Sequence, residues 1–236
     1  MAANEEEHNM KIVMITGSAH RHGTTAALAD KFQQGAQDAG HEVYRFDAAF
    51  QDVHPCIGCD KCRRTGICTF EADDMKLLNP HLLAADVVVF VSPVYYFTIN
   101  AQLKAVIDRF YANNEALMGG KKAVLITAMA DTEMDSALAG NEMFRQMTGY
   151  LAWEKAGILN VCSASTAADL REDDLTRAYA LIGYHRASYS RKGIACSHAM
   201  PFCGNGPLRG CDTPSAAFRC RCPRFCSAPF SAPASR

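Results

Sequence analysis

The sequence predicts an α/β protein built on a five-stranded, parallel, doubly wound sheet with helices on both faces. Two observations support this prediction. Strand-like apolar runs alternate with helical patterns five times along the first 187 residues, which is the order of elements in a parallel sheet joined by crossover helices. The run at 86–93 contains five consecutive apolar residues, as expected for a strand buried on both faces. In such sheets, ligands bind beyond the carboxyl ends of the strands.

The first elements follow from local patterns. KIVMITG (11–17) is a β-branched run that ends in glycine, and residues 24–40 have helical spacing with a terminal glycine suited to a helix C-cap. HEVYRFD (41–47) alternates as a strand does. Residues 72–85 predict a helix that is interrupted at Pro80, because proline lacks the N–H that a helix interior needs.

The second half of the body continues the alternation. Residues 100–114 place apolar side chains on one helical face, with Asn100 as the expected N-cap. The remaining elements are a strand at 121–128, a helix at 134–152, a strand at 156–162 and a helix at 174–187.

Charge and hydropathy exclude two classes of protein. Residues 1–187 carry a net charge of −7, so the body offers no broad basic face and we expect no nucleic-acid partner. No run of about 18 apolar residues is present, so we expect no membrane span. The acidic start, MAANEEEHNM, lacks the pattern of a signal peptide, and we therefore expect a cytoplasmic protein.

The last 49 residues differ in composition from the body. Residues 188–236 carry a net charge of +6 and hold six of the eleven cysteines and six of the nine prolines. This composition, without helical or strand periodicity, is typical of a disordered segment. We therefore expect a folded domain at 1–187 and a disordered tail at 188–236. Two alternatives stay open: metal binding by CRCPRFC (220–226), and a foreign or frame-slipped terminus.

The loop after the first strand, GSAHRHGTT (17–25), lies where this architecture binds phosphate. It has neither the Walker A pattern nor G-x-G-x-x-G, so it does not predict a nucleoside triphosphate or a dinucleotide. The hydroxyls of Ser18, Thr24 and Thr25, together with a helix N-terminus, can hold a phosphate monoester. His20 adds a donor. The alternative is an ordinary helix start with solvated basic residues.

The loop after the third strand, SPVYYFTINAQLKAVIDRFY (92–111), brings aromatic residues to the same edge. Tyr95, Tyr96 and Phe97 follow a buried strand, which suits the binding of a planar, partly apolar ligand. The alternative is a loop packed on its own helix or on another subunit.

These two motifs resemble those of the NADPH-dependent FMN reductases, over roughly residues 10–187. His20 stands where that family usually carries arginine, and Arg21 is displaced by one position. The resemblance implies a flavodoxin-like three-layer sandwich that binds FMN. The residues it assigns to the FMN phosphate are Ser18, His20, Thr24 and Thr25. The residues it assigns to the isoalloxazine are Pro93, Val94, Tyr95, Tyr96 and Phe97, with a third contact from the loop between Ala128 and Asp131.

The same resemblance implies an oxidoreductase. Such an enzyme takes electrons from NAD(P)H as co-substrate and passes them to a flavin, a quinone or another acceptor, which is a small molecule or a redox protein. It also implies a homodimer or homotetramer. Two other functions stay open: an electron carrier without a substrate of its own, and a zinc-binding regulatory module.

Four cysteines lie within thirteen residues, in CIGCDKCRRTGIC. Cys56, Cys59, Cys62 and Cys68 are spaced C-x2-C-x2-C-x5-C. In a reducing compartment, clustered cysteines bind metal or do redox work more often than they form disulfides. This run resembles that of the iron–sulfur flavoproteins, which implies a [4Fe–4S] cluster beside the FMN that relays electrons. Zinc and free thiols are the alternatives.

Overall fold

The computed structural model describes residues 9–182 of the chain. The expected tail at 188–236, and the last residues of the helix expected at 174–187, lie outside the described residues.

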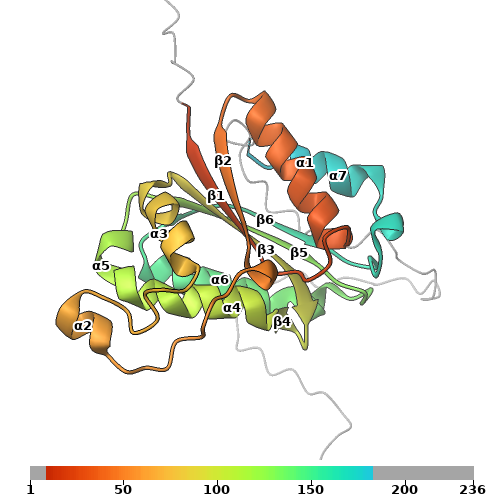
Figure 1. Ribbon diagram of the computed structural model, residues 1–236. Coiled ribbons are helices and arrows are strands. Elements are labelled where there is room, and N and C mark those ends of the chain that lie inside the picture. The colour runs from red at the N-terminus through yellow and green to blue at the C-terminus, as the bar shows by residue number, and fades with distance from the viewer. Residues whose placement is uncertain (1–8, 183–236) are drawn as a thin grey trace, which may run out of the picture. The chain divides into compact units, whose positions relative to one another are not determined.

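Five parallel strands form the centre of the fold (Figure 1). They are β1 (Lys11–Thr16), β2 (Glu42–Asp47), β3 (Val87–Tyr95), β5 (Lys122–Ala128) and β6 (Glu154–Val161). Their order, β2-β1-β3-β5-β6, is that of the flavodoxin-like doubly wound sheet, which confirms the predicted fold class. A two-residue strand, β4 (Thr98–Ile99), pairs antiparallel with the end of β3.

Helices cover the two faces of the sheet. Helices α1 (Thr24–Asp38) and α7 (Glu172–Ala180) lie on one face, while α3 (Met75–Ala84), α4 (Ala101–Asp108) and α6 (Leu138–Tyr150) lie on the other (Figure 1). The remaining segments are short. They are α2 (Lys61–Thr65), α5 (Asn114–Leu117), and the 3-10 turns η1 (Ala48–Phe50), η2 (Arg109–Asn113), η3 (Met134–Ala137) and η4 (Ala167–Asp169).

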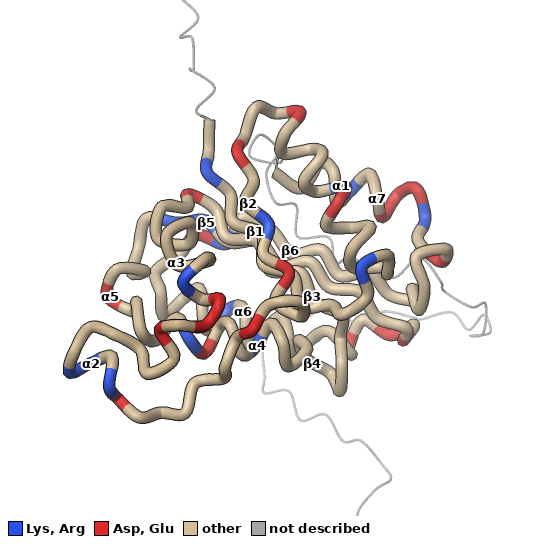
Figure 2. The backbone as a smooth tube through the Cα atoms, viewed as in Figure 1, with Lys and Arg blue, Asp and Glu red and all other residues tan. Residues whose placement is uncertain are grey.

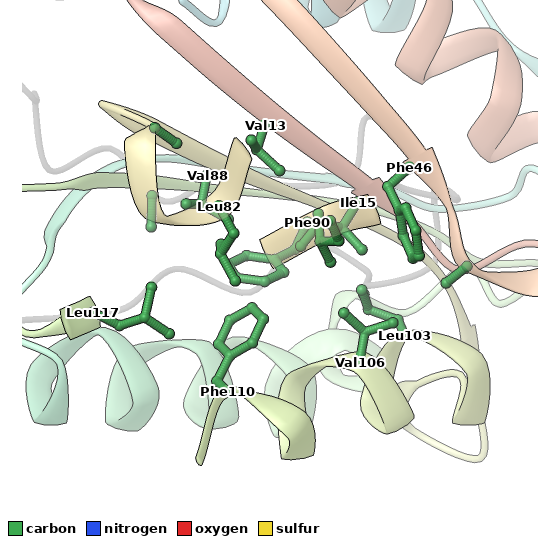
Figure 3. Close-up of a cluster of buried hydrophobic side chains, with 14 of the residues drawn as sticks. Val13, Ile15, Phe46, Leu82, Val88, Phe90, Leu103, Val106, Phe110 and Leu117 are labelled. Carbon is green, nitrogen blue, oxygen red and sulfur yellow. The ribbon is translucent and has the colours of Figure 1, made fainter. Parts of the chain in front are cut away.

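Two apolar clusters lie on opposite faces of the sheet because successive strand residues point to opposite sides. In β1, Met14 packs with the α1 side and Ile15 with the α3–α4–α6 side. On the latter side, Phe90 of β3 meets Phe110, with ring centroids 6.2 Å apart (Figure 3). Burial on both faces explains why the central strands β1, β3 and β5 each contain a continuous apolar run. Within residues 9–182, no helix is both long and apolar enough to cross a bilayer.

Two predicted helices differ from those observed. Pro80 does not interrupt α3, which runs through it. Proline removes one backbone hydrogen bond, but Leu78 and Leu82 on either side are fully buried against the sheet and hold the helix in place. The helix predicted at 100–114 ends at Asp108 and tightens into η2. There Arg109 turns inward and is buried.

Candidate functional site

A cavity of about 830 Å³ lies at the carboxyl ends of β1, β3, β5 and β6. Its walls are the segments 18–25, 93–95, 128–130 and 164–167. It includes the β1–β3 switch point, where doubly wound folds bind ligands, and its volume is typical of sites for small molecules and cofactors.

The first wall is a cradle of hydroxyls and backbone N–H groups. Ser18, Thr24 and Thr25 are all buried there, and the Ser18 Oγ accepts a hydrogen bond of 3.1 Å from the His20 N–H. The N-cap of α1 is Gly23, which has no side chain that could form a capping bond. The first backbone N–H groups of a helix then remain available to a ligand, and the positive end of the helix dipole favours an anion.

A buried polar network locks this wall to the next one. The Asn100 side-chain amide donates to the Gly17 carbonyl, and its backbone N–H donates to the Ser92 Oγ at 2.9 Å. Ser92 in turn donates to the Pro93 carbonyl at 2.7 Å. A Cβ at Gly17 would lie 2.0 Å from Asn100 Oδ1, so this position requires glycine. Asn100 is at the helix N-cap, as predicted, but its side chain makes no capping bond and instead joins the β1 and β3 loops.

The second wall ends in a strained hairpin. Tyr95 pairs with Thr98, so the two-residue turn between β3 and β4 is Tyr96–Phe97. Their φ angles are 47° and 67°, the left-handed region that a type I′ turn demands and that Asn and Gly usually fill. Tyr96 is 97% exposed and Phe97 is 62% exposed. The turn therefore holds two bulky side chains in an unfavourable conformation, at the rim of the cavity.

The third wall, at 128–130, is continued by a segment that does not line the cavity. The Asp131 carboxylate accepts hydrogen bonds from the Ser136 hydroxyl and from the Glu133 N–H. The hydrogen bond from Ser136 is the main cause that holds the pKa of Asp131 below its usual value. Asp131 thus organises the segment that leads into η3.

The fourth wall was missed by the sequence analysis. Residues 164–167 follow β6, and the Thr24 hydroxyl donates to the Ala164 carbonyl at 3.3 Å. The signal was present, because the serines and threonines of SASTAA come directly after a predicted strand and therefore lie at the same edge of the sheet. Ser165 and Thr166 add two hydroxyl-bearing side chains to the cavity.

Most predicted FMN contacts meet in this cavity. Ser18, His20, Thr24, Thr25, Pro93, Val94, Tyr95 and Ala128 line it, whereas Tyr96, Phe97 and Asp131 do not. Arg21 also lines it, and its guanidinium carbon lies 3.6 Å from the Phe50 ring centroid. Hydroxyls at a helix start, opposite a wall of proline, valine and tyrosine, fit a ligand with one phosphate and one planar ring. In this respect the residues present fit FMN.

The four cysteines occupy a separate place. Cys56 and Cys59 are exposed, Cys62 and Cys68 are half-buried, and all four are free thiols. They lie in and around α2, which contains Cys62. This helix lies away from the start of α1 (Figure 1), among charges of both signs (Figure 2). None of them lines the cavity, and their place beside the flavin stays a prediction.

The donor set of this loop suits an iron–sulfur cluster in kind and spacing, but its present arrangement does not gather the thiols. Within residues 9–182, no three His, Cys, Asp or Glu side chains are grouped closely enough to hold a metal ion.

Comparisons with known proteins point to one family. The sequence model of the NADPH-dependent FMN reductases matches residues 10–153. An iron–sulfur flavoprotein of Archaeoglobus fulgidus is 33% identical over 112 residues, which is 47% of this chain and 50% of that protein. Another, from Methanocaldococcus jannaschii, is 33% identical over 100 residues, or 42% and 51%. The chain thus spans about half the length of the curated relatives it matches.

Among solved structures, an NAD(P)H:quinone oxidoreductase from Methanothermobacter marburgensis aligns with a TM-score of 0.62. The alignment covers 78% of this chain and all of that one at 18% identity, which shows a shared fold.

Proposed function

The chain belongs to the NADPH-dependent FMN reductase family, and from this premise we propose that it is an FMN-dependent oxidoreductase. It takes electrons from NAD(P)H and passes them to a flavin, a quinone or another acceptor. The observation that carries the proposal is the cavity at the switch point, where buried hydroxyls at the start of α1 lie opposite an apolar wall.

The proposal gives each wall a role. Ser18, Thr24, Thr25 and the first N–H groups of α1 hold the phosphate of FMN, and Pro93 to Tyr95 lie against its ring. Bound FMN supplies the redox chemistry, because it accepts a hydride and returns the electrons to an acceptor. The chain needs no general base for this chemistry. Its residues bind the cofactor, orient the ring and limit the access of water.

The ligand is FMN and not FAD in this proposal. The first wall offers hydroxyls for one phosphate monoester, and the sequence has no G-x-G-x-x-G fingerprint for a dinucleotide. Heat release followed by chromatography identifies the bound flavin.

We further propose that Cys56, Cys59, Cys62 and Cys68 hold a [4Fe–4S] cluster. Two observations support this: the spacing of four free thiols, and the names of the relatives, which are called iron–sulfur flavoproteins. Iron and acid-labile sulfide assays on anaerobically purified protein test the cluster. Stoichiometric zinc without sulfide would replace the proposal with a zinc site.

The partners in this proposal are a small-molecule acceptor or a redox protein, and a second copy of the chain in a homodimer or homotetramer. The self-association is what the resemblance to this family implies. Light scattering of the FMN-loaded protein measures the number of copies.

The decisive experiment is the double variant Thr24→Ala/Thr25→Ala. A hydrogen bond to a charged phosphate is worth about 1.5–3 kcal/mol, so FMN affinity should fall at least tenfold in a fluorescence titration. NADPH oxidation at low FMN should fall with it. The matched control is Thr65→Ala, which removes an exposed hydroxyl bonded to the Lys61 carbonyl. Unchanged FMN affinity in the double variant would place the phosphate elsewhere.

A further inference from the structure

We propose that Arg109 and Asp73 form a clamp that fixes the base of the cysteine loop, defined here as residues 55–69. Arg109 is then a positioning residue for the four thiols. The inference rests on the proposed metal-binding function of that loop. It assigns a task to a buried ion pair that lies outside the FMN cavity.

Arg109 joins three segments through one guanidinium group. Both members of the pair have side chains that are only 3% exposed. Arg109 Nη1 donates to Asp73 and, at 2.8 Å, to the His54 carbonyl. Its Nη2 donates to the Phe70 carbonyl at 3.0 Å. His54 directly precedes the cysteine loop and Phe70 directly follows it, so Arg109 binds both ends.

Asp73 closes the same junction from the other side. Its carboxylate accepts hydrogen bonds of 3.1 Å from the backbone N–H groups of His54 and Met75. The rings of His54 and Phe70 stack, with centroids 4.7 Å apart and planes 12° apart. The two ends of the loop are therefore held together by charge, by hydrogen bonds and by ring contact.

The interior of the loop is held by exposed side-chain contacts, one of them the ion pair between Lys61 and Glu71, 3.9 Å apart. Tyr111, two residues after Arg109 in η2, donates its hydroxyl to Asp60 at 2.9 Å. Gly58, Asp60 and Gly66 all have positive φ, and these residues lie between the cysteines. A fixed base limits the conformations that the loop must give up when its thiols gather, while the glycines supply freedom for the gathering itself.

Stability alone does not account for the pair. A buried ion pair costs desolvation, and apolar residues of the same volume often stabilise a fold as well or better. The Arg109 Nε is buried and has no partner within the described part of the chain, so even this pair is not fully satisfied. Binding both loop ends and a carboxylate at once needs the planar fork of arginine, which lysine does not provide.

The test is Arg109→Lys, which keeps the charge beside Asp73 but removes the fork. Peptide-resolved hydrogen exchange is measured across the chain, together with FMN affinity and with iron and sulfide content after anaerobic reconstitution with Fe²⁺ and sulfide. We expect exchange across 51–74 to become at least about tenfold faster. We also expect most bound iron to be lost and FMN affinity to stay as in the wild type. The matched control, Arg171→Lys, alters another arginine paired with a buried aspartate, Asp174, and should leave both loop readouts unchanged.

Two results would overturn the clamp. One is wild-type exchange and iron content in Arg109→Lys. The other is exchange that accelerates throughout the sheet with parallel loss of FMN, because the pair would then be a general stabiliser. If the wild type itself binds no iron, the cluster proposal fails while FMN binding stands, and the exchange result alone decides the clamp. Should Arg109→Lys not fold, Phe70→Ala removes the ring contact at the same junction and is judged by the same readouts.

Discussion

Replacing Tyr96 by asparagine should stabilise the protein without its cofactor. Tyr96 has a φ of 47°, and a left-handed backbone costs a non-glycine residue about 1–2 kcal/mol, a cost that asparagine largely escapes. The side chain is 97% exposed, so its removal forfeits almost no buried area. The net gain in the free energy of unfolding is therefore about 1 kcal/mol, which raises the Tm of a domain of this size by about 2–4 °C.

The same substitution tests the function of the turn. If the Tyr96 ring covers the flavin, its loss should weaken FMN binding by about 0.5–1.5 kcal/mol, the typical worth of an aromatic contact beyond its buried area. The apoprotein would then gain stability while its FMN affinity falls two- to tenfold. In this interpretation, the strained backbone of Tyr96 is retained because the tyrosine ring contacts the bound flavin.

Urea denaturation of the apoprotein and a fluorescence titration with FMN measure the two effects separately. The control is Tyr150→Asn, which removes a tyrosine that is 64% exposed at the end of α6, where the backbone is helical. That variant should gain nothing, because no positive φ is relieved. A less stable Tyr96→Asn apoprotein would refute the strain argument. A more stable one with unchanged FMN affinity would show that the ring does not cover the flavin.

Four further substitutions or truncations address other parts of the chain. Gly17→Ala should lower both FMN affinity and the free energy of unfolding, the latter by about 1–3 kcal/mol, because its Cβ would lie 2.0 Å from Asn100 Oδ1. Burial by itself would raise the pKa of Asp73, but hydrogen bonds from Arg109 and from two backbone N–H groups outweigh it and hold the pKa below 3.8. The stability that this carboxylate contributes is therefore present above pH 3.8 and lost as the pH falls through the folded pKa. Asp73→Asn should lower the free energy of unfolding by about 3–5 kcal/mol at pH 7. This difference from the wild type should shrink in acid, as measured by urea midpoints. Truncation after Ala187 should leave flavin content intact, since all five parallel strands precede it. Cys62→Ser should abolish the absorbance of the cluster and keep the flavin spectrum, and parallel loss of both would tie the two sites together.

The fold class and the edge of the sheet that holds the cavity could be predicted because they depend on signals that are local in the chain. Apolar runs of four or five residues, as in β1, β3 and β5, with turn residues between them, specify buried parallel strands. The loops that follow these strands then meet at one edge of the sheet. This is why Ser18 and Thr24, on one loop, and Tyr95, far from them in sequence, are expected in one site, and all three line one cavity. The segment 164–167 obeys the same rule, because SASTAA comes directly after a predicted strand.

Contacts between distant segments could not be predicted. The sequence predicts a helix over 100–114, but α4 ends at Asp108, where the Arg109 side chain turns inward. Its buried partner is Asp73, 36 residues away in the chain. Likewise, nothing local marks Asn100 as the partner of Gly17, 83 residues away.

The sequence by itself therefore determined the sheet, its two-sided burial and the edge at which a phosphate-bearing ligand would bind, because hydrophobic periodicity and turn chemistry act over a few residues. Only the tertiary structure decided that the Asn100 side chain, at the N-cap of α4, bonds to Gly17, and that Arg109, in η2 directly after α4, binds the base of the cysteine loop. It also decided that the four thiols are separate from the cavity within one chain. The physical reason is that buried polar groups must find partners wherever the packed fold places them, and local propensities do not specify those partners.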